Sequence, residues 1–277
     1  MRLIYRHRFV GGSETSSQAY SPVYTDDGET SLEEHLFTTG VTGYVGNSDG
    51  SISEIRVRID DSEEEATAFL LSIDGGPEVE YSDNNTKCCG FTFENEAGDQ
   101  FEIGFEEFGP EGSLLYAYLY NAEETEWSEG SFGVHTAPNA LPEGSAYYDG
   151  YWNASGETET TGIEAGGHLE IEVDFNSGLL AGYTEGGFDA YDDNLEDETG
   201  GEFYGSIVGS VEDSELNADM IVIGDASGQF DLLGAFYGEE GEIAAGGIGG
   251  SLTSEFGEMN LGGSFTLEHG GDFCDEC

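Results

Sequence analysis

Basic residues are almost absent from this sequence. Its 277 residues include six lysines and arginines against 59 aspartates and glutamates, a formal net charge of −53, and no lysine or arginine follows Lys87. A chain without a cationic surface cannot displace counterions from nucleic-acid phosphates, and anionic lipid headgroups do not attract it. The composition therefore excludes ordinary nucleic-acid binding and electrostatic attachment to membranes.

Long apolar runs and prolines are scarce as well. No stretch approaches the roughly 20 apolar residues of a membrane-spanning helix, so we expect no direct membrane span. Residues 1–12 carry arginines but no apolar run of signal-peptide length; a cytoplasmic chain and a leader that was trimmed or lies upstream both stay open. With 44 glycines, 17 phenylalanines and 15 tyrosines against five prolines, the chain can bury a core, and its glycines are expected in β-turns and bulges.

The excess of carboxylates has two interpretations. A charge of this size repels itself strongly, and the Debye length falls from about 10 Å at 0.1 M salt to about 3 Å at 1 M, which suits a marine or halophilic habitat. The alternative is divalent-cation binding. The densest acidic run lacks the spacing of an EF-hand loop, so we expect a solvated loop, with these residues as the calcium candidates: Asp189, Asp192, Asp193 and Asp197.

The first half of the chain predicts a small β-rich domain. Residues 1–30 show little periodicity and form a loose lead-in, and residues 30–36 predict a short connecting helix with capping-box spacing. Alternation of apolar and polar residues is typical of half-buried strands. It places strands over 51–60, 68–73, 91–94, 100–105 and 114–120. No helical spacers separate them, so residues 31–133 are expected to form an antiparallel β domain.

The second half predicts a barrel. Residues 134–144 carry two prolines and no strand can run through both, so they are expected to be a linker. About eight strands follow in residues 145–268, joined by short hairpins such as Asn176–Gly178. In the clearest of these strands, residues 168–175, alternation places Leu169, Ile171, Val173 and Phe175 inward and His168 outward. This arrangement favours an all-β, antiparallel, eight-stranded up-and-down barrel, because closure removes exposed strand edges. A tail with two cysteines, residues 269–277, ends the chain.

Three segments of this half resemble the transferrin-binding protein B-like family. Residues 132–150 resemble its barrel-entry pattern, residues 173–178 its V-D-F-x-x-G hairpin, and residues 234–247 its G-x-F-Y-G signature. The matching positions are Pro138, Pro142, Gly144, Gly150, Gly178, Gly234, Phe236, Tyr237, Gly238, Gly246 and Gly247. Glu239 stands where the family has proline, and no lipobox cysteine lies near the N-terminus.

The resemblance implies a variable N-terminal domain followed by an eight-stranded barrel in a surface-exposed or released protein. Members of the family bind host iron-carrier proteins, complement regulators, or haem and haemoproteins. Fold analogy does not transfer the ligand, and the acidic surface argues against an anionic host partner. We therefore expect a location outside the cell or on the outer-membrane surface, and a protein or small-molecule ligand.

The four cysteines, Cys88, Cys89, Cys274 and Cys277, predict structural disulfides, the simplest being one or two links between the tail and the N-terminal domain. A zinc site built from these thiols and free thiols are the alternatives. Cysteines in both halves also allow disulfide-linked self-association.

Aromatic and histidine residues supply the remaining candidates. An aromatic patch near the expected domain boundary, Trp127, Tyr147, Tyr148, Tyr151 and Trp152, is either interdomain core or a ligand-binding patch. All of these except Tyr147 are the ligand-binding candidates. No cofactor is expected; calcium and haem stay open, with His135 or His168 as the haem candidates.

No arrangement of residues resembles a nucleophile and base, so the sequence predicts a non-catalytic exported binding protein. The alternative is a structural or adhesive component of an extracellular assembly, such as a surface layer, filament or virion decoration.

Overall fold

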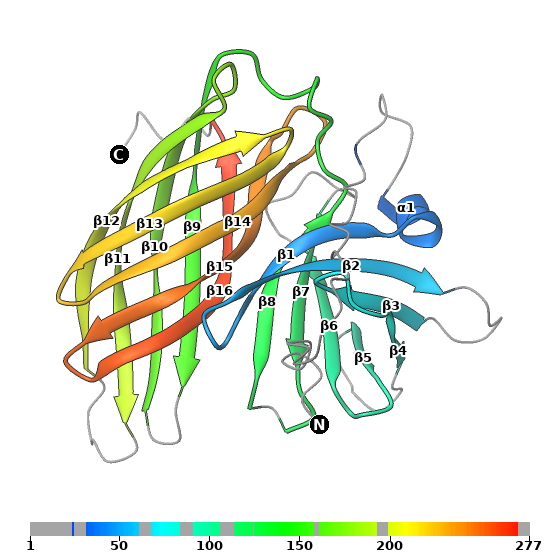
Figure 1. The fold of residues 1–277 in the computed structure, drawn as a ribbon, viewed down its shortest axis with the longest axis horizontal. Helices are drawn as coiled ribbons and strands as arrows, with labels where there is room; N and C mark the ends of the chain where they lie inside the picture. Colours follow the sequence, from blue (N-terminus) through cyan, green and yellow to red (C-terminus); the bar gives the residue numbers. More distant parts are fainter. Residues whose placement is uncertain are drawn as a thin grey trace, which may run out of the picture.

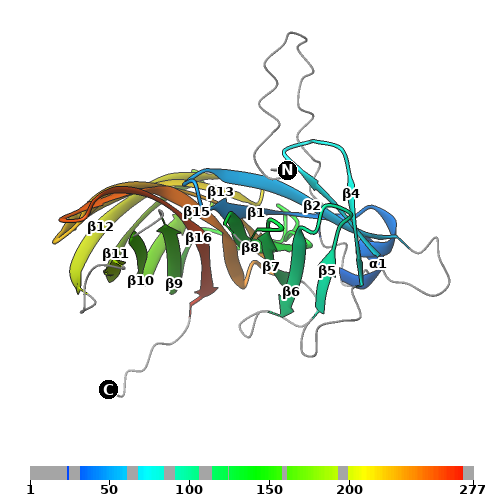
Figure 2. The same ribbon diagram turned by 90° about the horizontal axis from the view of Figure 1, so that it is seen from below.

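The computed structural model describes residues 24, 32–60, 68–83, 91–105, 114–123, 125–157, 161–192 and 199–270. Within them the chain is all-β apart from one short helix, as the sequence predicted. Two closed antiparallel barrels of eight strands each follow one another along the chain, and they lie side by side (Figures 1 and 2). None of the described helices is long and apolar enough to cross a membrane.

The first barrel contains β1 to β8, each paired with its neighbours in chain order and closed by pairing of β1 with β8. Helix α1 (Leu32–Thr38) precedes it. The strands are β1 (Val41–Asn47), β2 (Ile52–Asp60), β3 (Ala68–Ile73), β4 (Val79–Asp83), β5 (Phe91–Glu94), β6 (Gln100–Phe105), β7 (Leu114–Tyr120) and β8 (Trp127–Gly133). The predicted helix and five strands are confirmed. Strands β1, β4 and β8 were not predicted, and neither was the closure of this half into a barrel.

Alternation explains the core of the first barrel. Ile55 and Val57 of β2 are fully buried, and α1 adds Leu32 and Leu36 to the same apolar cluster. The β3–β4 turn is shaped by Asp74 and Gly75, both at positive φ, which is the dihedral pattern of a tight hairpin turn. The helix therefore packs against the core as well as leading into the barrel.

The second barrel is the eight-stranded up-and-down barrel that the sequence predicted, closed by pairing of β9 with β16. Its strands are β9 (Ser145–Glu157), β10 (Thr161–Asp174), β11 (Leu179–Asp192), β12 (Thr199–Glu212), β13 (Glu215–Gly224), β14 (Ser227–Tyr237), β15 (Ile243–Ser254) and β16 (Gly257–His269). Rings such as Trp152, Phe203 and Phe230 fill the interior. The predicted hairpin turn before β11 has Gly178 at φ +69°, and its N–H donates to the Asp174 carbonyl.

The two barrels touch along β1 and β8 of the first and β15 and β16 of the second. Gly46 of β1 lies directly against Ile248 and Gly263, and Gly247 lies against Val45 and Gly46. Side chains at these positions would collide with the backbone of the opposite barrel. The glycine-rich stretch of β15, which includes the motif residues Gly246 and Gly247, therefore allows close contact between backbones.

The segment expected to be a linker begins inside this junction. Val134, His135 and Thr136 are buried, and Thr136 donates from its backbone N–H to Phe236 and from its hydroxyl to Gly238. Gly144 then adopts φ +86° at the start of β9. The prolines lie between these points, where the chain passes over one end of the second barrel.

Candidate functional site on the outer wall of the second barrel

The four aromatic residues proposed from the sequence do not form one patch. Strand β9 alternates, so Tyr148 and Trp152 point into the second barrel, where both are buried, while Tyr151 points outward with 64% of its surface exposed. Trp127 lies in the first barrel, stacked on Tyr118. The interdomain-core interpretation is corrected as well, because Tyr148 and Trp152 belong to the interior of one barrel.

Exposed tyrosines instead gather on the outer wall over β9 to β13. We define the tyrosine face as these outward side chains, in which large apolar groups meet solvent: Tyr147, Tyr151, Tyr183, Tyr204, Val208, Ile221 and Ile223. Strands β11 and β12 lie on the side of the second barrel away from the first (Figure 1). Exposed clusters of large apolar side chains mark interaction surfaces.

Strand register places this face in rows. Tyr151 pairs with His168, His168 with Glu185, and Glu185 with Tyr204. Tyr204 pairs in turn with Ile223. This row thus brings two rings and a branched chain together with two polar groups, a composition that suits a protein interface.

Carboxylates on this wall are bound by neutral donors. The Tyr183 hydroxyl donates to Glu170, and this bond raises the pKa of Tyr183 to about 12. Tyr147 also donates to Glu170, and burial together with this bond raises its pKa. His168 lies on the outward side of β10 as predicted, with Nε2 3.3 Å from Asp149 and Nδ1 3.4 Å from Glu170.

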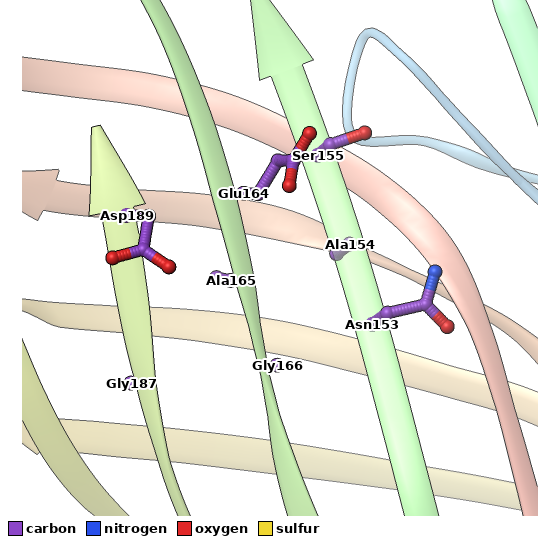
Figure 3. A pocket seen from close by; sticks show the side chains of 8 residues that line it. All are labelled: Asn153, Ala154, Ser155, Glu164, Ala165, Gly166, Gly187 and Asp189. Atoms are coloured by element: carbon purple, nitrogen blue, oxygen red, sulfur yellow. The ribbon is translucent and has the colours of Figure 1, made fainter. Parts of the chain in front are cut away.

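A hollow of about 560 Å³ adjoins the rows (Figure 3). Glu164 of β10 pairs in register with both Ser155 of β9 and Asp189 of β11, and the next outward position carries Gly166 opposite Gly187. The two glycines leave the floor without side chains, and Glu164 and Asp189 form its rim. The calcium candidate Asp189 is thus part of a carboxylate pair with Glu164.

A second hollow, of about 300 Å³, lies where residues 138–143 cross the end of the second barrel. The motif residues Pro138 and Pro142 line it together with Phe175 and Gly178. Tyr148 donates from inside the barrel to the Gly241 carbonyl and so fixes the adjoining turn. Several motif positions therefore meet at this barrel end, where they shape the turns.

The histidine and metal candidates occupy different surroundings. His135 is buried in the junction between the rings of Tyr24 and Tyr237, and desolvation lowers its pKa to about 4.

Among the other calcium candidates, Asp192 is the last residue of β11, whereas Asp193 and Asp197 lie outside the described residues. In the parts of the chain that the structure describes, no three histidine, cysteine, aspartate or glutamate side chains are grouped to hold a metal. Cys88, Cys89, Cys274 and Cys277 lie outside the described residues, so their disulfides stay a prediction.

The polar contact between barrels was not foreseen. Glu129 of β8 is buried and accepts hydrogen bonds from Tyr116 at 2.7 Å and from the Asn153 amide at 2.5 Å, while Ser264 Oγ lies 3.3 Å away. Burial raises the pKa of Glu129. The burial of Glu129 was not predicted, because strand β8 itself was not predicted and a polar residue in a glycine-rich segment carries no signal of burial.

Comparisons with known proteins add little to this site. No protein-family model and no curated protein matches the chain. Among solved structures, transferrin-binding protein B from Haemophilus parasuis, in a mutant form, is similar with a TM-score of 0.45 and 16% identity, over 83% of this chain and 44% of that one. A protein of unknown function from Nostoc punctiforme aligns with a TM-score of 0.24 and 12% identity, over 87% of this chain and 99% of that one.

This chain spans less than half of the transferrin-binding protein B chain. A structural similarity this distant supports no conclusion about a ligand or a binding site. The pair of eight-stranded barrels is shown, and membership of the family that the sequence motifs resemble stays a prediction.

Proposed function

We propose that this protein is a non-catalytic binding protein that recognises a protein partner through the tyrosine face of its second barrel. The main observation that supports this proposal is the concentration of large apolar side chains on this one wall. Every exposed large hydrophobic residue among the described residues lies in β9 to β13. Tyrosine supplies a large contact area with few rotatable bonds, which is why it is common at binding hot spots.

The architecture supports a rigid platform for this face. Long antiparallel strands fix the outward side chains in register, and Trp152, which donates to Thr184 at 2.8 Å, packs the wall from inside. A preorganised surface loses little side-chain freedom on binding. We propose further that the protein acts outside the cell or on the outer-membrane surface, as the motif resemblance implies.

The experiment is affinity capture from the extracellular medium of the source organism with three versions of the immobilised chain. The wild type, Tyr151→Ser/Tyr204→Ser and the control Leu179→Ser are compared, because Leu179 is as exposed as Tyr204, 63% against 61%, but lies at the hairpin end of β11. A protein retained by the wild type and the control but lost by the double variant supports the proposal. Equal retention by all three contradicts it.

A structural or adhesive role in an extracellular assembly is the second candidate, and it depends on the cysteines rather than on this face. Non-reducing electrophoresis separates the two functions. Disulfide-linked multimers favour assembly, and a monomer favours the binding protein.

A further inference from the structure

The tyrosine face carries negative charge, and among the described residues no lysine or arginine lies beside it. Its rows include Asp149, Glu170, Glu172 and Glu185, and no lysine or arginine occurs anywhere in β9 to β16. His168, the one histidine in these rows, already lies against Asp149 and Glu170. These strands therefore supply no strong cation of their own to the carboxylates, and a docking partner can supply one.

Tyrosine hydroxyls act as the hydrogen-bond donors to these carboxylates in place of basic side chains. Tyr147 and Tyr183 both donate to Glu170. Neutral donors satisfy the carboxylate oxygens but leave the negative charge in place, whereas an ammonium or guanidinium group would form hydrogen bonds and also neutralise the charge. The face is thus chemically complementary to a positively charged surface.

The hollow beside the face has the shape for one long side chain. Gly166 and Gly187 leave its floor open, and Glu164 and Asp189 lie on adjacent strands at the same register level (Figure 3). Tyr151 follows on β9 one outward position beyond Asn153, on the side of the glycines away from Glu164 and Asp189. An alkyl stem lying over the glycines would place its cation between the two carboxylates, while the stem itself covers the open floor.

A second copy of this chain is a poor occupant for the same reason. Two molecules of net charge −53 repel each other, and pairing of two tyrosine faces would bring carboxylates against carboxylates. Like-charge contacts of this kind disfavour association.

We propose that the tyrosine face docks a lysine- or arginine-rich segment of a partner protein, with one basic side chain in the hollow between Glu164 and Asp189. This inference rests on the proposed function and names the chemistry of the partner. Apolar contacts with Tyr151 and Tyr204 hold the segment on the wall, and the carboxylates select it by charge.

The test uses a fluorescein-labelled peptide of six Lys-Gly repeats, with binding followed by anisotropy in 0.15 M NaCl. We compare the wild type with Glu164→Gln/Asp189→Asn and with the control Glu239→Gln/Glu240→Gln. The control removes the same charge from exposed positions in the β14–β15 turn. A tenfold or greater loss of affinity in the first variant, with less than a twofold change in the control, supports the proposal, provided that thermal melts show all three proteins folded.

Equal losses in both variants mean diffuse attraction to an acidic surface and overturn the proposal, as does a wild type that does not bind the peptide. Affinity capture of the natural partner distinguishes a failure of this proposal from a failure of the proposed function. If Tyr151→Ser/Tyr204→Ser loses the partner while Glu164→Gln/Asp189→Asn retains it, the face binds but its partner is not selected by charge. If both variants retain the partner, the proposed function fails as well.

Discussion

Single residues at the barrel junction combine burial with polarity. His135 is 1% exposed, with Nε2 3.4 Å from the Thr42 hydroxyl and, among the described residues, no hydrogen-bond partner for Nδ1. Its charged form is disfavoured because burial removes water from the ring. A histidine that must stay neutral makes the junction sensitive to acid.

Replacement of His135 by glutamine should therefore reduce the acid sensitivity of the fold. The folded-state pKa of about 4 lies below the ordinary 6.5, so the folded state binds fewer protons between these values and stability is lost as pH falls through that window. The wild type should lose up to about 3 kcal/mol more than His135→Gln between pH 7 and pH 4. Urea unfolding at both pH values measures this difference, and equal losses in the two proteins would contradict it.

Glu129 gives the opposite pH dependence. Its pKa is raised by burial, so the folded state keeps the carboxyl proton up to a higher pH than the unfolded state does. The contribution of this proton to stability therefore falls as pH rises from the ordinary carboxyl pKa toward the raised pKa. Glu129→Ala should cost about 1–3 kcal/mol at pH 7, because Tyr116 and Asn153 lose their acceptor.

Glu129→Gln is the matched control, since it keeps the shape and one acceptor oxygen without the charge. Its free energy of unfolding, measured in urea at pH 4 and pH 7, should vary less than that of the wild type. A Glu129→Ala protein as stable as the wild type would show that these hydrogen bonds do not stabilise the junction.

At the scale of elements, glycine decides how closely the barrels approach. A Cβ on Gly247 of β15 would lie 2.6 Å from the backbone nitrogen of Gly46 in β1, and neither backbone can yield without a shift of the barrel. Gly187, on the outer wall, would meet only Gly201, with its carbonyl oxygen 2.9 Å away. The same residue type thus has different roles on the two sides of the second barrel.

Gly247→Val should therefore destabilise the protein by about 1–3 kcal/mol, the usual cost of overpacking, and should move the barrels apart. Denaturant unfolding measures the first effect and the radius of gyration from solution scattering measures the second. Gly187→Ala serves as the control and should leave the radius of gyration unchanged. An unaltered radius in Gly247→Val would contradict the close contact between β1 and β15.

Strand alternation shows what could be predicted for individual elements. The period of two placed Leu169, Ile171 and Val173 inside the second barrel and His168 outside, and the structure confirms each of them. The same rule, applied to β9, separates Tyr151 from Tyr148 and Trp152, which were grouped by proximity in the sequence. The same rule can identify the outward side chains of the tyrosine face, but only the register of β9 to β13 shows that they lie next to each other.

At the scale of the whole molecule, the surface charge dominates. The net charge of −53 makes neighbouring carboxylates repel each other in the folded state, and added salt screens this repulsion. Rising NaCl from 0.1 to 1 M should raise the midpoint of thermal unfolding. A flat or falling midpoint, measured by circular dichroism, would contradict the interpretation of the acidity as an adaptation to salt.

Composition and alternation by themselves determined the all-β class and the closed second barrel, because these depend on local periodicity. The exclusion of polyanionic partners depends on total charge and stays a prediction. Only the tertiary structure decided that residues 41–133 also close into a barrel, since glycine-rich β1 and β8 carry weak local signals and become strands by pairing with each other. It also decided the site, because the tyrosine face joins residues from four strands, and only the long-range register of the sheet brings these residues next to each other.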